Sequence, residues 1–219
     1  MTRPLILINF KLYKEAAGNK SLALARKLSK VKASKYEIAI APSLLTAKEI
    51  AEKVNIKVFA QHCSDVGLGA HTGRISPIEL KKIVVKGVIL NHSERKIPLR
   101  ILQKIVESCK KQKLQTVVCA STLSEVKKVA KLKPAFIAYE PKELIGSDIS
   151  VTKAKPKIIV KAVDIVKKIN KNTRVLCGAG IHTQEDIGQA LLLGTTGVLI
   201  GHAVPKAKDP KKFLEKLLV

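Results

Sequence analysis

An apolar run near the middle of the chain ends abruptly in a carboxylate. Residues 135–139 read Ala-Phe-Ile-Ala-Tyr, and Glu140 and Pro141 follow. Because a residue before proline favours an extended backbone, we expect Glu140 to end a buried strand, while Gly146 lets the next loop bring backbone N–H groups close to a ligand. A carboxylate placed in this way can act as a general base. A strand that ends in a solvated glutamate before an ordinary turn has the same pattern, and this stretch alone favours that alternative, so the rest of the chain must decide.

Other apolar runs are also followed by residues that can bind or polarise a substrate. A lysine and a histidine can stabilise negative charge on an oxygen while a carboxylate opposite them removes a proton. Each residue alone has an ordinary alternative: Lys11 as one of 35 surface lysines, His92 as a histidine at a rim, and the glycines as tight turns. The residues are Asn9 and Lys11, His92, Gly178 and Gly180, and Gly201 and His202.

Strand-like and helix-like segments alternate along the whole chain. Continuous apolar runs, typical of strands buried on both faces, cover residues 5–9, 37–41, 57–60, 87–90, 116–119, 135–139, 174–177 and 197–200. Amphipathic segments between them include residues 21–31, 99–111, 122–131, 156–168 and 184–193. This alternation predicts an α/β protein, a closed (β/α)₈ barrel that forms a single domain over residues 1–219. In such barrels the functional residues follow the carboxyl ends of the strands, which is where the residues named above lie.

The composition favours a cytoplasmic globular protein. Hydrophobic residues make up 46% of the chain, and we find no apolar run of about 18 residues, so no membrane span is expected. The amino terminus does not resemble a signal peptide. The four cysteines are far apart, without a CxxC pair, and are expected to be reduced packing residues.

The net charge of +24 raises the possibility of a nucleic-acid partner. The lysines, however, are spread over nearly every predicted helix rather than gathered in one arm or interleaved with aromatic residues. A nucleic-acid partner is therefore unlikely from the sequence, and the charge would serve solubility or attract anionic substrates.

Six short segments occur in order along the chain: Asn9-Phe10-Lys11, Asn91-His92-Ser93-Glu94-Arg95, Tyr139-Glu140-Pro141, Ile145-Gly146-Ser147, Cys177-Gly178-Ala179-Gly180-Ile181 and Gly197-Val198-Leu199-Ile200. With them the chain closely resembles the triosephosphate isomerase family, whose fold is the TIM barrel, and its shortness resembles the compact archaeal-type branch. The resemblance implies an isomerase of glycolysis and gluconeogenesis that interconverts dihydroxyacetone phosphate and D-glyceraldehyde 3-phosphate through an enediolate. No metal and no organic cofactor is expected.

The resemblance also implies roles for individual residues. Glu140 would move the proton, His92 would act as the electrophile at the carbonyl, and Lys11 would stabilise the developing charge. We expect a helix that begins at His92, and a lid over residues 141–150. The substrate-binding residues would be Asn9, Lys11, Ile145, Gly146, Gly178, Gly180, Gly201 and His202.

Two positions depart from the family pattern, since His202 and Asp148 stand where small residues are usual. The segment that runs from Gln61 to Gly73 resembles the family's third loop, which inserts into a neighbouring subunit. We therefore expect a homo-oligomer, a tetramer or alternatively a dimer, with residues 62–76 in a contact. The alternatives to the isomerase are another phosphate-binding barrel enzyme and a basic nucleic-acid-binding barrel.

Overall fold

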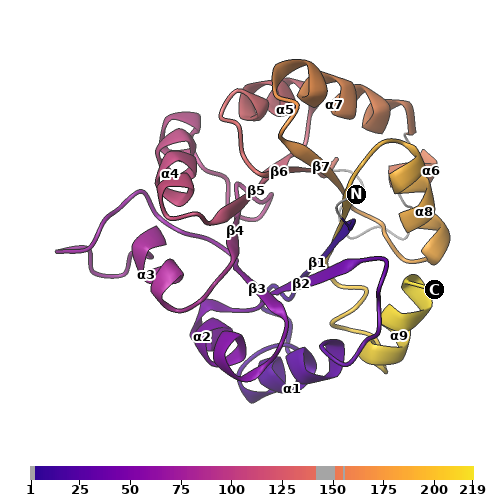
Figure 1. The fold of residues 1–219 in the computed structure, drawn as a ribbon, viewed down its shortest axis with the longest axis horizontal. Helices are drawn as coiled ribbons and strands as arrows, with labels where there is room; N and C mark the ends of the chain where they lie inside the picture. Colours follow the sequence, from indigo (N-terminus) through magenta and orange to yellow (C-terminus); the bar gives the residue numbers. More distant parts are fainter. Residues whose placement is uncertain (1–2, 142–150, 155) are drawn as a thin grey trace.

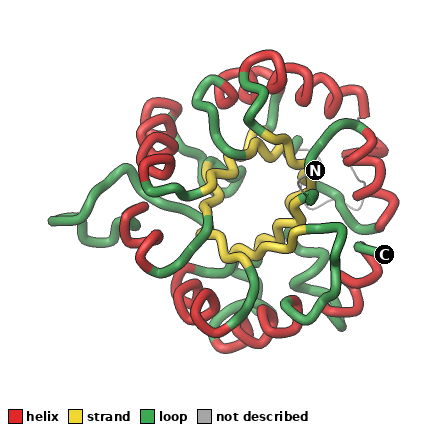
Figure 2. The backbone as a smooth tube through the Cα atoms, in the orientation of Figure 1, coloured by secondary structure: helices red, strands yellow, loops and turns green. Residues whose placement is uncertain are grey.

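The computed structural model describes residues 3–141, 151–154 and 156–219, and they form a closed barrel in which parallel strands β1 to β8 follow one another in order. Figures 1 and 2 show the strands as an inner ring enclosed by helices. The predicted closed (β/α)₈ barrel is confirmed. The strands are β1 (Leu5–Asn9), β2 (Glu37–Ala41), β3 (Lys57–Ala60), β4 (Gly87–Leu90), β5 (Gln115–Ala120), β6 (Phe136–Tyr139), β7 (Arg174–Gly178) and β8 (Gly197–Ile200).

The strands are apolar along their length because both of their faces are buried. In β1, Leu5 and Leu7 belong to the cluster inside the barrel, while Ile6 and Ile8 belong to the cluster between barrel and helices. Phe59 and other large side chains fill the interior, so the barrel is a packed core. Full burial of each such side chain stabilises the fold by about 1.5–3 kcal/mol.

The barrel closes between β1 and β8 at a glycine. Leu5 pairs with Gly197, and the Leu5 N–H donates to the carbonyl of Thr196 at 3.0 Å. Gly197 has a φ of +146°, and a Cβ built there would lie 2.6 Å from the Leu5 nitrogen and closer still to its oxygen. Only glycine allows the two backbones this approach.

The helices pack around the outside of the ring and supply the second layer (Figure 1). Several begin at a capping side chain, such as the Thr183 hydroxyl, which accepts from the Asp186 N–H at 3.2 Å. The helices of the described part are α1 (Asn19–Leu28), α2 (Leu44–Lys53), α3 (Pro77–Lys82), α4 (Leu99–Lys111), α5 (Leu123–Ala130), α6 (Val151–Ala154), α7 (Pro156–Ile169), α8 (Gln184–Leu192) and α9 (Pro210–Leu217).

The predicted segments agree closely with these elements. The predicted segment 99–111 has the same bounds as α4. The predicted segment 21–31 starts two residues after the start of α1 and runs past its end. The helix ends earlier because the N–H groups of Lys30 and Val31 donate to carbonyls three residues back and form a tight turn. All four cysteines are free and buried. Within the described residues, every helix is too short or too polar to cross a membrane.

Candidate active site

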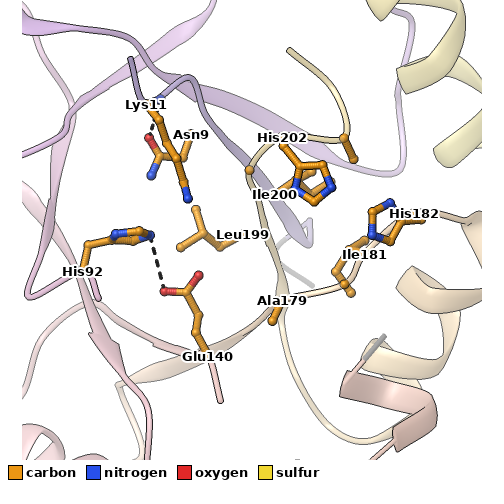
Figure 3. Close-up of a pocket in the computed structure, with 13 residues that line it drawn as sticks. Asn9, Lys11, His92, Glu140, Ala179, Ile181, His182, Leu199, Ile200 and His202 are labelled. Carbon is orange, nitrogen blue, oxygen red and sulfur yellow. Dashed lines mark hydrogen bonds and ion pairs between the residues drawn. The ribbon is translucent and has the colours of Figure 1, made fainter. Parts of the chain in front are cut away.

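A pocket opens where the strands end, and it gathers seven of the residues predicted from the sequence (Figure 3). Gly178 lies just behind it. Ile145 and Gly146 lie outside the described residues, as does most of the predicted lid. The lining consists of Asn9, Lys11, His92, Glu140, Ala179, Gly180, Ile181, His182, Leu199, Ile200, Gly201, His202 and Ala203.

Lys11 is held by a tight turn at the end of β1. Its backbone has a φ of +47°, and its N–H donates to the Asn9 side-chain oxygen at 3.0 Å. The Gln61 amide donates to the Lys11 carbonyl at 3.0 Å and to the Ala41 carbonyl at 2.9 Å, which ties this turn to the end of β2. The Lys11 side chain is thereby directed into the pocket (Figure 3).

Glu94 links the lysine to the histidine. Its carboxylate accepts from Lys11 Nζ at 2.7 Å and lies 3.6 Å from His92 Nδ1. Burial acts to lower the pKa of Lys11, but the hydrogen bond to Glu94 and its negative charge outweigh burial, so the pKa is raised. Lys11 therefore stays a cation at neutral pH.

A backbone hydrogen bond defines the tautomer of His92. The Glu94 N–H donates to His92 Nδ1 at 3.2 Å. A ring nitrogen that accepts a hydrogen bond carries no proton, so the neutral ring carries its N–H at Nε2. Nε2 lies 4.0 Å from a carboxylate oxygen of Glu140, across the mouth of the barrel (Figure 3).

The expectation of a helix that begins at His92 is wrong, because α4 begins seven residues later at Leu99. Asn91 explains the difference. It has a φ of +57°, its side-chain oxygen accepts from the Ile97 N–H at 3.0 Å, and its amide donates to the Cys119 carbonyl at 2.9 Å. The segment from Asn91 to Ile97 is thus a loop closed by the Asn91 side chain rather than the start of α4, and the Glu94 N–H of that loop holds the His92 ring.

Glu140 lies at the end of β6 with only 6% of its surface exposed. Its Oε2 atom is buried and has no hydrogen-bond partner in the described part of the structure. A buried, unpartnered carboxylate oxygen is costly unless a ligand completes the site. Burial, together with the negative charge of Glu140, raises the pKa of the Cys119 and Cys177 thiols, so neither is a thiolate nucleophile at neutral pH.

Gly178 supports Glu140 from behind. A Cβ built on Gly178 would lie 2.9 Å from Glu140 Oε1 and 3.0 Å from its Cδ, and closer still to its Cγ. The register that pairs Tyr139 with Cys177 brings these two chain positions together. The glycine therefore provides the space that the carboxylate occupies.

The loops after β7 and β8 form the opposite wall. Ala179 and Gly180 have φ values of +71° and +66°, which turn the chain sharply. After β8, the Lys206 N–H donates to the His202 carbonyl at 3.0 Å, and residues 201–209, which the structure describes in full, form turns rather than a helix. Pro205 has no N–H to donate to Gly201, so the helical turn does not continue.

Two polar residues of the site were not predicted from the sequence. Glu94 is the nearest anion to Lys11, and the signal for it was its place two residues after His92. The ring centroid of His182 lies 5.3 Å from that of His202. The sequence signal for His182 was its position two residues after Gly180.

Comparison with known proteins decides the family. A family model described as triosephosphate isomerase matches residues 4–217. The chain belongs to the triosephosphate isomerase family. The triosephosphate isomerase of Methanothermus fervidus is 42% identical, with 100% of this chain and 99% of that protein covered. The triosephosphate isomerase of Methanocaldococcus jannaschii is 42% identical, with 98% of this chain and 98% of that protein covered. That of Archaeoglobus fulgidus is 44% identical, with 97% of this chain and 96% of that protein covered.

The triosephosphate isomerase match covers every residue that lines the pocket. The family assignment and the geometry of the pocket thus refer to the same part of the molecule.

Proposed function

We propose that this chain is an isomerase that interconverts dihydroxyacetone phosphate and D-glyceraldehyde 3-phosphate, a step of glycolysis and gluconeogenesis. The observation that carries the proposal is the arrangement of three groups in one pocket. Glu140 faces His92 at 4.0 Å, and Lys11 lies in the same pocket. Family membership and the relatives named triosephosphate isomerase support the same reaction.

Glu140 is the base in this proposal. Removal of a proton next to a carbonyl needs a carboxylate that is not already engaged by donors. The free Oε2 atom of Glu140 meets that requirement in the described structure. The proton taken from one carbon of the substrate is then returned to the neighbouring carbon, which converts ketose to aldose.

His92 and Lys11 act on the oxygens, where negative charge accumulates in the enediolate. The N–H at Nε2 of His92 points into the pocket because Nδ1 is engaged by the Glu94 backbone. Lys11 supplies a fixed positive charge, and its ammonium group has Glu94 as counter-ion before a substrate enters. Donors that are already in position stabilise such charge without reorganisation.

The phosphate would be bound at the wall formed by the glycine turns. Gly180 and Gly201 line the pocket and have no side chain that would block the approach of an anion to the backbone. His202 would contribute its main-chain N–H. Asn9 would act through Lys11, whose turn it fixes. Ile145 and Gly146 remain proposed contacts from outside the described residues.

A coupled assay of triose-phosphate isomerisation, run on the wild type and on Glu140→Gln, tests the proposal. We expect wild-type turnover and a large loss in the variant. If the wild type shows no turnover, this assignment fails, and another phosphate-binding barrel enzyme or a basic nucleic-acid-binding barrel becomes the alternative.

We also propose that the chain is one barrel domain and forms a cytoplasmic homo-oligomer, a tetramer or a dimer. Large apolar side chains are exposed at the pocket end: Leu12 is 78%, Leu45 is 95% and Leu68 is 58% exposed. The loop between β3 and α3 that carries Leu68 projects far from the barrel (Figure 1). Such apolar exposure is typical of an interface. Sedimentation that shows a compact particle of monomer mass at micromolar concentration would exclude the oligomer.

A further inference from the structure

The isomerase reaction does not account for the net charge of +24, and the fold distributes this charge unequally between the two ends of the barrel. Because all eight strands are parallel, every loop that leads from a helix into a strand lies at the end opposite the pocket. These loops contain eight lysines and no Asp or Glu. The loops in question are residues 29–36, 54–56, 83–86, 112–114, 131–135, 170–173 and 193–196.

The pocket end has no such imbalance. In the loops that follow the strands, the described residues include seven Lys or Arg and five Asp or Glu. The loops at the end opposite the pocket thus carry eight positive charges without a negative one, whereas the described loops at the pocket end have an excess of only two. We call the eight lysines of loops 29–36, 83–86, 112–114, 131–135 and 170–173 the lysine face.

All eight side chains of the lysine face are exposed. None of them lies within 4.0 Å of a carboxylate among the residues that the structure describes. The loops also contact one another: the Gln115 N–H donates to the Lys86 carbonyl at 3.0 Å, and the Thr173 hydroxyl donates to the Pro134 carbonyl at 2.8 Å. Several lysine-bearing loops are thus direct neighbours at this end of the barrel.

Two of these lysines occupy strained backbone positions. Lys113 and Lys133 each have a φ of +55°, just after α4 and α5. Glycine is the usual residue at such a helix end because it has no Cβ to strain this conformation. The helix dipole favours a cation nearby, but it does not require one at the left-handed position. The chain carries a cation at both sites at a cost in stability.

We infer that the lysine face binds the phosphate backbone of a nucleic-acid duplex without sequence preference. Clustered, flexible ammonium groups bind phosphates by releasing their counter-ions. The aromatic residues near this end, Tyr36 and Phe136, are half-buried and buried, so no ring of the described residues at this end is fully exposed for stacking on single-stranded bases. The proposed subunit contacts lie at the opposite end and leave this face open.

The test is fluorescence anisotropy with a random-sequence DNA duplex of about 24 base pairs at about 100 mM salt. We expect the wild type to bind with a Kd on the order of 10⁻⁶ to 10⁻⁴ M. The triple variant Lys113→Glu, Lys133→Glu and Lys171→Glu should weaken binding at least tenfold. It should also reduce the slope of log K against log salt by about two to three.

A matched control has the same net charge. Lys20→Glu, Lys104→Glu and Lys161→Glu change three exposed lysines within α1, α4 and α7. This variant should bind almost as well as the wild type, with a loss below about threefold. Both triple variants should keep the isomerase kcat/KM, so the result on binding is independent of the proposed function.

The strained positions provide a second variant. Lys113→Gly with Lys133→Gly should raise the thermal midpoint, since it relieves the left-handed strain, and should still weaken duplex binding. Absence of wild-type binding at about 100 mM salt, or equal losses in the two triple variants, would overturn the inference. Binding to vesicles that contain anionic lipid, without binding to the duplex, would overturn it as well.

Discussion

Gly178→Ala tests how tightly the structure constrains the carboxylate of Glu140. The added Cβ would lie 2.9 Å from Glu140 Oε1 and 3.0 Å from Cδ, where ordinary carbon contacts are about 3.5–4.0 Å. The backbone of Gly178 cannot retreat, because β7 is paired on both sides, through Cys177 with Tyr139 and through Gly178 with Leu199. The side chain of Glu140 must therefore move by about 1 Å, which is the difference between an ordinary carbon contact and the distances from the added Cβ.

A displacement of this size has a large kinetic cost. Misplacement of a reacting group by about 1 Å can lower the rate about 100-fold, which corresponds to about 2.7 kcal/mol of activation free energy. We expect kcat of Gly178→Ala to fall by about this factor, with little change in KM because the phosphate wall is not touched. The assay is steady-state isomerisation with a coupled dehydrogenase.

Gly188→Ala is the matched control. A Cβ at Gly188, within α8, would contact nothing within 4 Å, and alanine is a better helix former by up to about 1 kcal/mol. This control should keep full activity and gain slightly in stability. Near-wild-type kcat for Gly178→Ala, or a loss of kcat that is matched by a loss of folded protein in circular dichroism, would refute the reasoning.

Three further predictions concern Lys11, His202 and His62. Lys11→Met should lower kcat/KM by at least about tenfold through loss of charge stabilisation, whereas Lys161→Met should leave it unchanged, and equal effects would contradict a site role. His202→Ser should change KM by less than about tenfold, since only its main chain is proposed to bind phosphate; a larger change would mean that the ring contacts the substrate. Burial, with the charges of two nearby arginines, lowers the pKa of His62 to about 4. Because an unfolded histidine titrates near about 6.5, the unfolded state binds more protons in that interval, so stability should fall from pH 6.5 to 4, and urea melts of His62→Gln should show a weaker fall.

Most of the strands could be predicted from the sequence because strands that are buried on both faces are continuously apolar. Residues 5–9, 37–41, 57–60, 87–90 and 197–200 match the observed strands to the residue. The start of α4 could not be predicted in this way. Its position depends on the left-handed backbone of Asn91 and on side-chain hydrogen bonds that close the following loop.

The chemistry of the site could be predicted from the residue types, but the contacts that hold the catalytic side chains in place could not. The position of Glu140 after an apolar run indicates a base at a strand end, and the barrel topology brings it to the same mouth as His92. The contact between Gly178 and Glu140 depends on the register of β6 and β7, which no local pattern specifies. The pairing of Lys11 with Glu94 likewise joins residues 83 positions apart in the chain.

The most direct test of the account is the kcat of Glu140→Gln in the coupled isomerase assay. Glutamine keeps the shape and the hydrogen-bonding capacity of the side chain but cannot accept the proton. If Glu140 moves the proton, kcat should fall by roughly 10² to 10⁴, while the thermal midpoint of the protein stays close to that of the wild type. A Glu140→Gln protein that keeps near-full kcat would contradict the central claim.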